Sequence, residues 1–193
     1  RLPSVPFYMT TDNHYGTKLA VSTWGIAHFG TETPTNLKPS RVYVYDFDGA
    51  TGNLSSDRFF EEDGISGSIG FSWAKNSSRL YVSNFNLVPE KRDHSLTVLE
   101  DNGEAVAKIA NFGTGEGNDI DEACWTTLSE DGRKLYVSSF GGNVISEFDV
   151  DLSGNVSKVG DGSDTVYASR KAGTPGGDTK DMYLSADGKF MYV

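Results

Sequence analysis

The sequence Ser-Glu-Asp-Gly-Arg-Lys-Leu-Tyr-Val-Ser-Ser, at residues 129–139, decides the fold because the chain repeats it. A second copy, Ser-Ala-Asp-Gly-Lys-Phe-Met-Tyr-Val, occupies residues 185–193. Looser copies lie at residues 74–84 and 16–23. The aligned apolar residues of the four copies are 61, 55 and 56 residues apart, counted between Leu19, Leu80, Leu135 and Met191. Repetition at this period indicates repeated supersecondary units.

Each clear copy has the same order of parts: a short apolar run, an Asp-Gly turn and a strand of the Leu-Tyr-Val type. Asp-Gly is favoured where two antiparallel strands meet in a tight turn. Residues 143–150 alternate between two faces, which is the period of a strand. The turn at residues 151–154 then leads into a last strand at residues 155–159. One unit is therefore predicted to be four antiparallel strands joined by short hairpins.

Repeated four-stranded units are typical of the blades of a β-propeller. We therefore predict an all-β propeller whose blades cover approximately residues 6–62, 66–112, 122–160 and, truncated, 180–193. A β-sandwich also has many short strands, but it does not explain a phrase that recurs at a fixed place. Propellers typically have 4–8 blades. Residues 1–193 are thus expected to be a partial propeller domain, completed by the remaining half in the same or a second chain.

Composition excludes several classes of function. The net charge is -10, from 17 basic and 27 acidic residues, without a basic stripe, so nucleic acid is not an expected partner. No apolar run is long enough to span a membrane. The single Cys124 is expected to be a small buried apolar residue. Trp24, Trp73 and Trp125 are interpreted as repeat-related residues that pack the blades.

Three Asn-x-Ser sequons begin at Asn53, Asn76 and Asn155. All three lie in, or just after, the tight turns that join the first strand to the second or the third to the fourth. Such turns are exposed and share one rim of a propeller, where a glycan is sterically easy to attach. The pattern predicts a secreted glycoprotein.

The other connections are long: residues 25–40, 85–94, 111–123 and 160–180. Long loops on a rigid scaffold concentrate binding residues, so the face that carries them is the candidate functional face.

Two loops on that face carry candidate ligands. The acidic loop before the third blade could bind calcium through carboxylates and carbonyls. The alternative is an acidic loop that is simply exposed to solvent. The acidic residues of this loop are Glu116, Asp119, Asp121 and Glu122. No other cofactor is expected. The loop before residue 182 mixes charges: Arg170 and Lys180 could hold a small anionic ligand. Asp178 and Asp181 could act as a general base, the alternative being surface ion pairs on a crossover loop.

Residues 123–148 and 181–193 resemble the seven-bladed lactonase-type propellers, which include propeller 6-phosphogluconolactonases and fungal carboxymuconate cyclases. The resemblance is good over residues 120–193, weaker over 66–110 and poor before that. It implies the fold more than an activity, because the matching motifs are structural. Active members are expected to carry a His, with Arg and Glu nearby, where the inner strands begin. Residues 70–72, 123–125 and 180–182 contain no His, so the catalytic residues are unknown at this point.

Two functions follow as alternatives. One is an enzyme that hydrolyses or cycloisomerises a small anionic lactone or its open hydroxy acid. The other is a secreted, glycosylated propeller that binds a ligand, a glycan or a protein partner without catalysis.

Overall fold

The computed structural model describes ten stretches of the chain. These are residues 6–10, 16–25, 40–61, 67–75, 77–85, 95–114, 122–140, 144–159, 165–168 and 181–193, with the backbone alone described for 6–10 and 165–168. Within these residues the chain forms strands and turns. No helix capable of spanning a membrane occurs among them.

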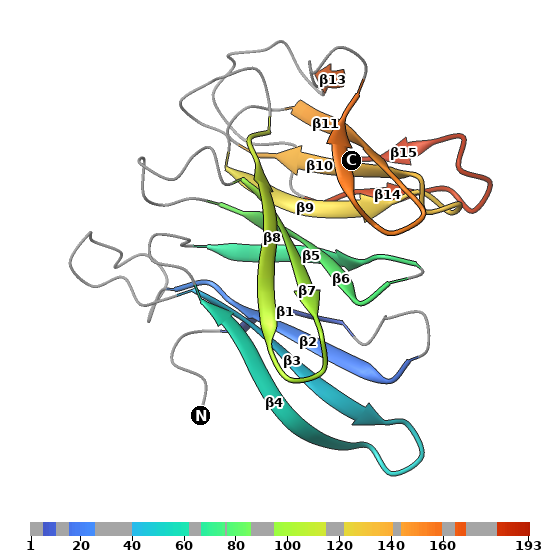
Figure 1. Ribbon diagram of the computed structural model, residues 1–193. Helices are drawn as coiled ribbons and strands as arrows, with labels where there is room; N and C mark the ends of the chain where they lie inside the picture. The colour runs from blue at the N-terminus through green and yellow to red at the C-terminus, as the bar shows by residue number, and fades with distance from the viewer. Residues whose placement is uncertain are drawn as a thin grey trace.

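The strands form antiparallel sheets in chain order, and Figure 1 shows the sheets following one another from blue at the bottom to orange at the top. The first blade is β1 (Pro6–Thr10), β2 (Lys18–Thr23), β3 (Arg41–Asp48) and β4 (Asn53–Glu61). The second is β5 (Ser68–Trp73), β6 (Arg79–Asn84), β7 (Leu96–Asp101) and β8 (Val106–Phe112). The predicted four-stranded antiparallel units are confirmed.

The third blade contains β9 (Ala123–Leu128), β10 (Lys134–Ser139), β11 (Val144–Val150) and an outer strand in two pieces. One piece, β12 (Val156–Lys158), pairs with the end of β11, and β13 (Thr165–Ala168) pairs with its beginning. Part of residues 160–180, expected to be a loop, is therefore a strand. The alternating Thr-Val-Tyr-Ala segment pairs with the part of β11 that β12 leaves open. A hairpin of β14 (Tyr183–Leu184) and β15 (Met191–Tyr192) follows.

The second blade is buried on both faces because it is packed between the first blade and the third. Leu80 and Tyr81 are neighbours in β6, and both are 0% exposed. Leu80 belongs to the apolar cluster between the first and second blades, whereas Tyr81 belongs to the cluster between the second and third. Since successive strand residues point to opposite faces, the Leu-Tyr-Val phrase supplies packing groups to both interfaces of its blade.

The recurring Ser-x-Asp-Gly turn has the same hydrogen bonds in both clear copies. The Ser129 hydroxyl donates to Asp131 at 2.6 Å and accepts the backbone N–H of Lys134 at 2.9 Å. In the later copy, Ser185 donates to Asp187 at 2.7 Å and accepts from the backbone of Phe190 at 3.0 Å. The phrase therefore closes its hairpin with side-chain hydrogen bonds to the backbone, as turn residues do.

The inner strands β5 and β9 approach closely at Gly70. A Cβ on Gly70 would lie 2.8 Å from the carbonyl oxygen of Cys124 and 2.9 Å from the Trp125 ring, so only glycine fits. Hydroxyls link successive inner strands: Ser72 donates to the Thr126 carbonyl at 3.0 Å, and Thr127 donates to the Met182 carbonyl at 3.1 Å. The fourth hairpin thus docks on the third blade by the same contact that joins the third to the second.

The three tryptophans do not occupy one repeat position, which corrects the sequence interpretation. Trp24 follows β2, Trp73 ends β5, and Trp125 lies inside β9. Trp73 pairs with Leu80, whereas the residue paired with Leu135 in the next blade is Leu128. The strand pairing therefore places Leu128, and not Trp125, at the position of the third blade that corresponds to Trp73.

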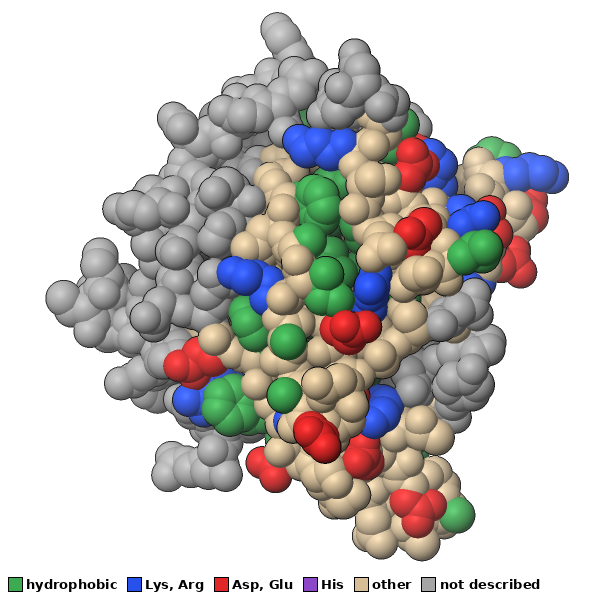
Figure 2. Space-filling model, in the orientation of Figure 1, with side chains coloured by type: hydrophobic (Ala, Val, Ile, Leu, Met, Phe, Trp, Pro, Cys, Tyr) green, Lys and Arg blue, Asp and Glu red, His purple; other side chains and the backbone are tan. Residues whose placement is uncertain are grey.

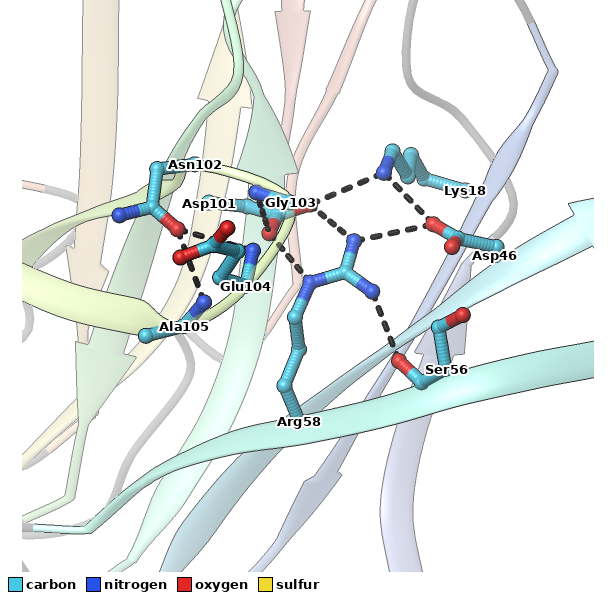
Figure 3. Close-up of polar contacts among 9 residues, drawn as sticks. All are labelled: Lys18, Asp46, Ser56, Arg58, Asp101, Asn102, Gly103, Glu104 and Ala105. Carbon is cyan, nitrogen blue, oxygen red and sulfur yellow. Dashed lines mark hydrogen bonds and ion pairs between the residues drawn. The ribbon is translucent and has the colours of Figure 1, made fainter.

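A buried ion-pair cluster joins the first two blades at the rim of the short turns (Figure 3). Arg58 of β4 donates to both carboxylate oxygens of Asp101, at 2.5 and 2.6 Å, and to Asp46 at 3.0 Å. Lys18 lies 2.6 Å from Asp46 and 3.4 Å from Asp101. The side chains of Arg58 and Asp101 are 5% and 0% exposed. This bidentate, desolvated pair links β4 of the first blade to β7 of the second.

The hydrogen bonds of this cluster shift the pKa values of its carboxyl groups. The pKa of Asp46 falls to about 2, chiefly through the hydrogen bond from Lys18. Burial raises the pKa of Asp101, but the hydrogen bonds from Arg58 and the Gly103 backbone outweigh it, so this pKa lies below its ordinary value. Both carboxyl groups are therefore ionised at neutral pH.

Candidate functional site

At the long-loop end of the blades, buried hydroxyl and amide groups form hydrogen bonds that link the strand ends. Ser40 donates to the Thr23 carbonyl at 2.8 Å and accepts the Ser68 backbone N–H at 3.0 Å. The Ser68 hydroxyl then donates to Asn84 at 3.0 Å, and Asn84 donates to Thr97 at 2.9 Å. The chain of hydrogen bonds runs from the first blade across the second and links these strand ends to one another.

A row of aromatic rings crosses three blades at the same end. Trp24, Phe85 and Phe140 each stand five residues after the repeated leucine of their unit. The ring centroids of Trp24 and Phe85 are 5.7 Å apart, and those of Phe85 and Phe140 are 6.1 Å apart. The rings meet edge-on or tilted, which is favourable aromatic packing. All three side chains are half-buried, so the row borders the candidate face.

The residues that directly precede the inner strands β5 and β9 have a left-handed backbone. Gly67 has φ of 87°, and its carbonyl accepts the backbone N–H of Phe85 at 2.8 Å. Glu122, 55 residues later, has φ of 44°, and its carbonyl accepts the backbone N–H of Phe140 at 2.9 Å. The two turns are equivalent, but the third blade places a half-buried glutamate where the second uses glycine.

At the long-loop end, the positive charge of Arg41 is balanced by Glu61 of the same blade. Arg41, the first residue of β3, pairs through Nε with the carboxylate of Glu61 and donates through Nη1 to the Tyr43 hydroxyl at 3.0 Å. Its guanidinium lies 4.4 Å above the Phe59 ring. The hydrogen bonds from Tyr43 and Glu61 raise the pKa of Arg41 above its ordinary value. Arg41 therefore has a structural role in the first blade.

Most of the predicted site residues lie outside the described residues: Arg170, Asp178, Lys180, Glu116, Asp119 and Asp121. Glu122 precedes β9 as described above. Asp181 is exposed and lies two residues before β14. Its carboxylate accepts a hydrogen bond from the backbone N–H of Met182 at 2.7 Å. Among the side chains that the structure describes, no three His, Cys, Asp or Glu residues gather into a metal site. Calcium binding by the acidic loop stays a prediction.

The described sequon asparagines differ in their contacts. Asn53 is exposed at the start of β4. The side-chain amide of Asn155 donates to Asp151 at 2.7 Å, and its oxygen accepts from Arg79 of the preceding blade. Asn76 lies outside the described residues.

Cys124 is buried in β9, at 8% exposure, as expected for a small apolar residue.

Figure 2 shows Lys and Arg side chains (blue) and Asp and Glu side chains (red) interspersed among hydrophobic side chains (green) and other surface (tan). This mixture on the described residues fits the charge balance of the sequence.

The fold defined by these blades is that of lactonase-type β-propellers. A candidate 6-phosphogluconolactonase from Bacteroides fragilis matches with a TM-score of 0.67 at 15% identity, over 97% of this chain and 49% of that one. A candidate 6-phosphogluconolactonase from Bacteroides uniformis matches with a TM-score of 0.60 at 13% identity, over 91% and 57%. The periplasmic gluconolactonase of Pseudomonas aeruginosa matches with a TM-score of 0.52 at 15% identity, over 96% and 64%.

These matches confirm the predicted propeller and show the fold alone, because fold does not determine activity. The chain spans about half the length of the first of these structures. No family model matches the sequence, and no curated protein matches it.

Proposed function

We propose that this propeller hydrolyses a sugar lactone at the long-loop end of its inner strands, with Glu122 as a catalytic carboxylate. The observation that carries the proposal is the left-handed backbone of Glu122, with φ of 44°. A left-handed conformation costs a non-glycine residue roughly 1–2 kcal/mol. The equivalent turn of the second blade avoids this cost with Gly67. Strain of this kind concentrates at functional positions.

The position of Glu122 suits the chemistry. It stands directly before β9, the inner strand of its blade, on the side where the long loops enter. The repeat interval of 56 residues assigns Asp178 to the same place in the next unit of the sequence. Two carboxylates on neighbouring units would then border one site, and Arg170 and Lys180 would hold an anionic group of the substrate.

In the proposed reaction, the Glu122 carboxylate removes a proton from water as the water oxygen bonds to the lactone carbonyl carbon. The bond between that carbon and the ring oxygen then breaks. The leaving oxygen takes the proton that Glu122 removed from water, which restores the carboxylate, and the product is the open hydroxy acid. General base catalysis of this kind contributes about 10²–10⁴-fold in rate.

The test is hydrolysis of glucono-1,5-lactone and its 6-phosphate by the complete protein, followed as acid release above the spontaneous rate. We expect Glu122→Gln to lower kcat by about 10²-fold or more. Glu130→Gln is the matched control, because Glu130 is exposed in the β9–β10 turn at the opposite rim. Equal rates for both variants, or no wild-type hydrolysis, would contradict the proposal. Detection of a cyclised isomer from an open acid would indicate cycloisomerisation instead.

Calcium is the alternative role for Glu122 and the acids before it. If the carboxylates act as bases, chelation by EDTA leaves hydrolysis unchanged. Loss of activity on chelation, restored by Ca²⁺ alone, would assign Glu122 to a metal site.

A second candidate function is binding without catalysis by a secreted glycoprotein, favoured by the exposure of Asn53 in its sequon. Glycosylation is proposed at Asn53 rather than Asn155, whose amide is bonded to Asp151. The mass of the native protein before and after removal of N-glycans tests this. A glycan on Asn53 together with no lactone turnover would favour the binding role, whereas an unmodified chain would remove its support.

We also propose that further blades, in the same or a second chain, complete the ring. The support is the share of the Bacteroides fragilis structure that the chain covers, 49%.

A further inference from the structure

The residue before the inner strand of the second blade is a glycine because aromatic side chains occupy the space around it. A Cβ on Gly67 would lie 2.7 Å from Nε1 and 3.0 Å from Cδ1 of Trp24, which belongs to the preceding blade. It would also lie 2.9 Å from the Cβ of Phe85, in the blade of Gly67 itself. A side chain has no room at these distances, so Gly67 is required by its neighbours as well as by its backbone.

The third blade repeats this arrangement with a different pair of residues. The carbonyl of Glu122 accepts the backbone N–H of Phe140 at 2.9 Å, as the carbonyl of Gly67 accepts that of Phe85 at 2.8 Å. The aromatic row continues from Trp24 through Phe85 to Phe140, with centroids 5.7 and 6.1 Å apart. Equivalent residues of successive repeats occupy equivalent places. The Phe85 ring therefore stands to Glu122 as the Trp24 ring stands to Gly67.

The two places differ in the ring and in the backbone. A phenyl ring is smaller than an indole. Trp24 stands at 84° to the next ring of the row, whereas Phe85 makes only 35° with the next ring. The φ of Glu122 is 44°, near the left-handed region of roughly +50 to +70° that residues with a side chain adopt. The φ of Gly67, at 87°, lies beyond that region. The place that is closed in the second blade is thus open to a side chain in the third.

We propose that Phe85 is a positioning residue for the Glu122 carboxylate, and that the ring of the preceding blade decides which blade carries an acid at this place. Trp24 excludes a side chain from position 67, whereas Phe85 admits one at position 122. The inference rests on the proposed function, because it explains why the third blade, and not the second, supplies the catalytic carboxylate.

Two neighbours then limit the movement of the Glu122 side chain. One is the Phe85 ring, on the side of the second blade. The other is the Cβ of Phe140, in the place that the Phe85 Cβ takes beside Gly67. A general base acts within about 2.6–3.2 Å of the proton that it removes. A displacement of about 1 Å can lower the rate by about 10²-fold, so the packing of this side chain matters for the reaction.

The test begins with a double-mutant cycle in the complete protein, read as the urea midpoint of unfolding. Phe85→Trp places an indole beside Glu122 and should lower the midpoint, because it overfills the site. In the Glu122→Gly background the same change should lower the midpoint much less, because the Trp24–Gly67 pair is then reproduced. Circular dichroism follows the unfolding, since the tryptophan content changes. Equal effects of Phe85→Trp in the two backgrounds would overturn the proposal.

Two matched variants check the reasoning at other positions of the row. Phe140→Trp adds the same indole one blade further on, so its effect on the midpoint should be the same with Glu122 and with Gly at that position. Gly67→Ala should lower the midpoint less in the Trp24→Phe background than in wild type. A dependence of Phe140→Trp on residue 122 as large as that of Phe85→Trp would contradict the assignment of Phe85.

Kinetics separate a positioning role from a purely structural one. We expect Phe85→Trp, under conditions in which it is folded, to lower kcat for lactone hydrolysis by about 10²-fold with KM unchanged. An unchanged kcat in a protein whose hydrolysis depends on Glu122 would overturn this inference and leave the proposed function intact. Absence of hydrolysis by wild type, with the midpoints still coupled, would instead remove the catalytic role of Glu122 and leave the packing of ring and acid established.

Discussion

Removal of the Asp101 carboxylate tests how the first two blades are held together. Asp101→Ala would leave the guanidinium of Arg58, whose side chain is 5% exposed, without its bidentate partner. Breaking a buried ion pair from one side costs about 3–5 kcal/mol, since a desolvated charge remains. Asp46 stays 3.0 Å from Arg58 and is 40% exposed, so it offsets part of the loss. We therefore expect a decrease of about 3 kcal/mol in the free energy of unfolding.

The assay is urea unfolding at pH 7, followed by tryptophan fluorescence. The double variant Arg58→Met/Asp101→Leu removes both charges together and should lie within about 1 kcal/mol of wild type, because apolar groups can replace a buried pair. Lys189→Ala removes an exposed pair, at 74% exposure for Lys189, and should change stability by less than about 1 kcal/mol. If Asp101→Ala cost no more than Lys189→Ala, the buried cluster would not be what joins the blades.

Three further outcomes are expected. The pKa values of Asp46 and Asp101 are depressed in the folded state, so the stability that these carboxylates contribute is present above about pH 4 and is lost as pH falls through the folded-state values, about 2 for Asp46. When the free energy of unfolding is followed from neutral to acid pH, it should therefore fall less for Asp101→Ala than for wild type. Parallel curves would contradict this. Gly70→Ala should lower the free energy of unfolding by about 1–3 kcal/mol, because the added methyl group forces β5 and β9 apart. Gly49→Ala should lower it less, because the nearest atom to the added Cβ, on the Phe47 side chain, is 3.8 Å away. Equal unfolding midpoints for the two variants would refute the close approach of the strands. Glu122→Gly should raise stability by roughly 1–2 kcal/mol and lower lactone turnover, and a lower melting temperature would contradict the strain argument.

The fold was predictable because its signals are local and repeated. The Ser-x-Asp-Gly phrase at residues 129–132 fixes a hairpin through bonds among neighbouring residues, and its copy at residues 185–188 fixes the next. Strand β13 was missed because four residues at 165–168 carry too short a pattern to distinguish a strand from a loop. Only the open edge of β11 makes them a strand.

The contacts between blades were not predictable in the same way. Arg58 and Asp101 lie 43 residues apart and have no shared motif. The aromatic row could have been found, because Trp24, Phe85 and Phe140 follow the repeated leucines at a constant distance. The tryptophans alone do not indicate the row, since two of its three members are phenylalanines.

The sequence indicates a location for the proposed site and only part of its residues, and both stay predictions. Loop length identified the end of the blades where Glu122 lies. In the sequence, Glu122 is one of the four acids of a predicted calcium loop, because its left-handed backbone is a property of the structure. The alignment with Gly67, 55 residues earlier, is the sequence signal that distinguishes it.

The most direct test of the central claim is an experimental structure of the complete protein with bound gluconate, the hydroxy acid released from glucono-1,5-lactone. The account predicts gluconate at the long-loop end of the inner strands, with an oxygen within hydrogen-bond distance of the Glu122 carboxylate. Gluconate bound only at the rim of the short turns, or with no contact to Glu122 at saturating concentration, would contradict it.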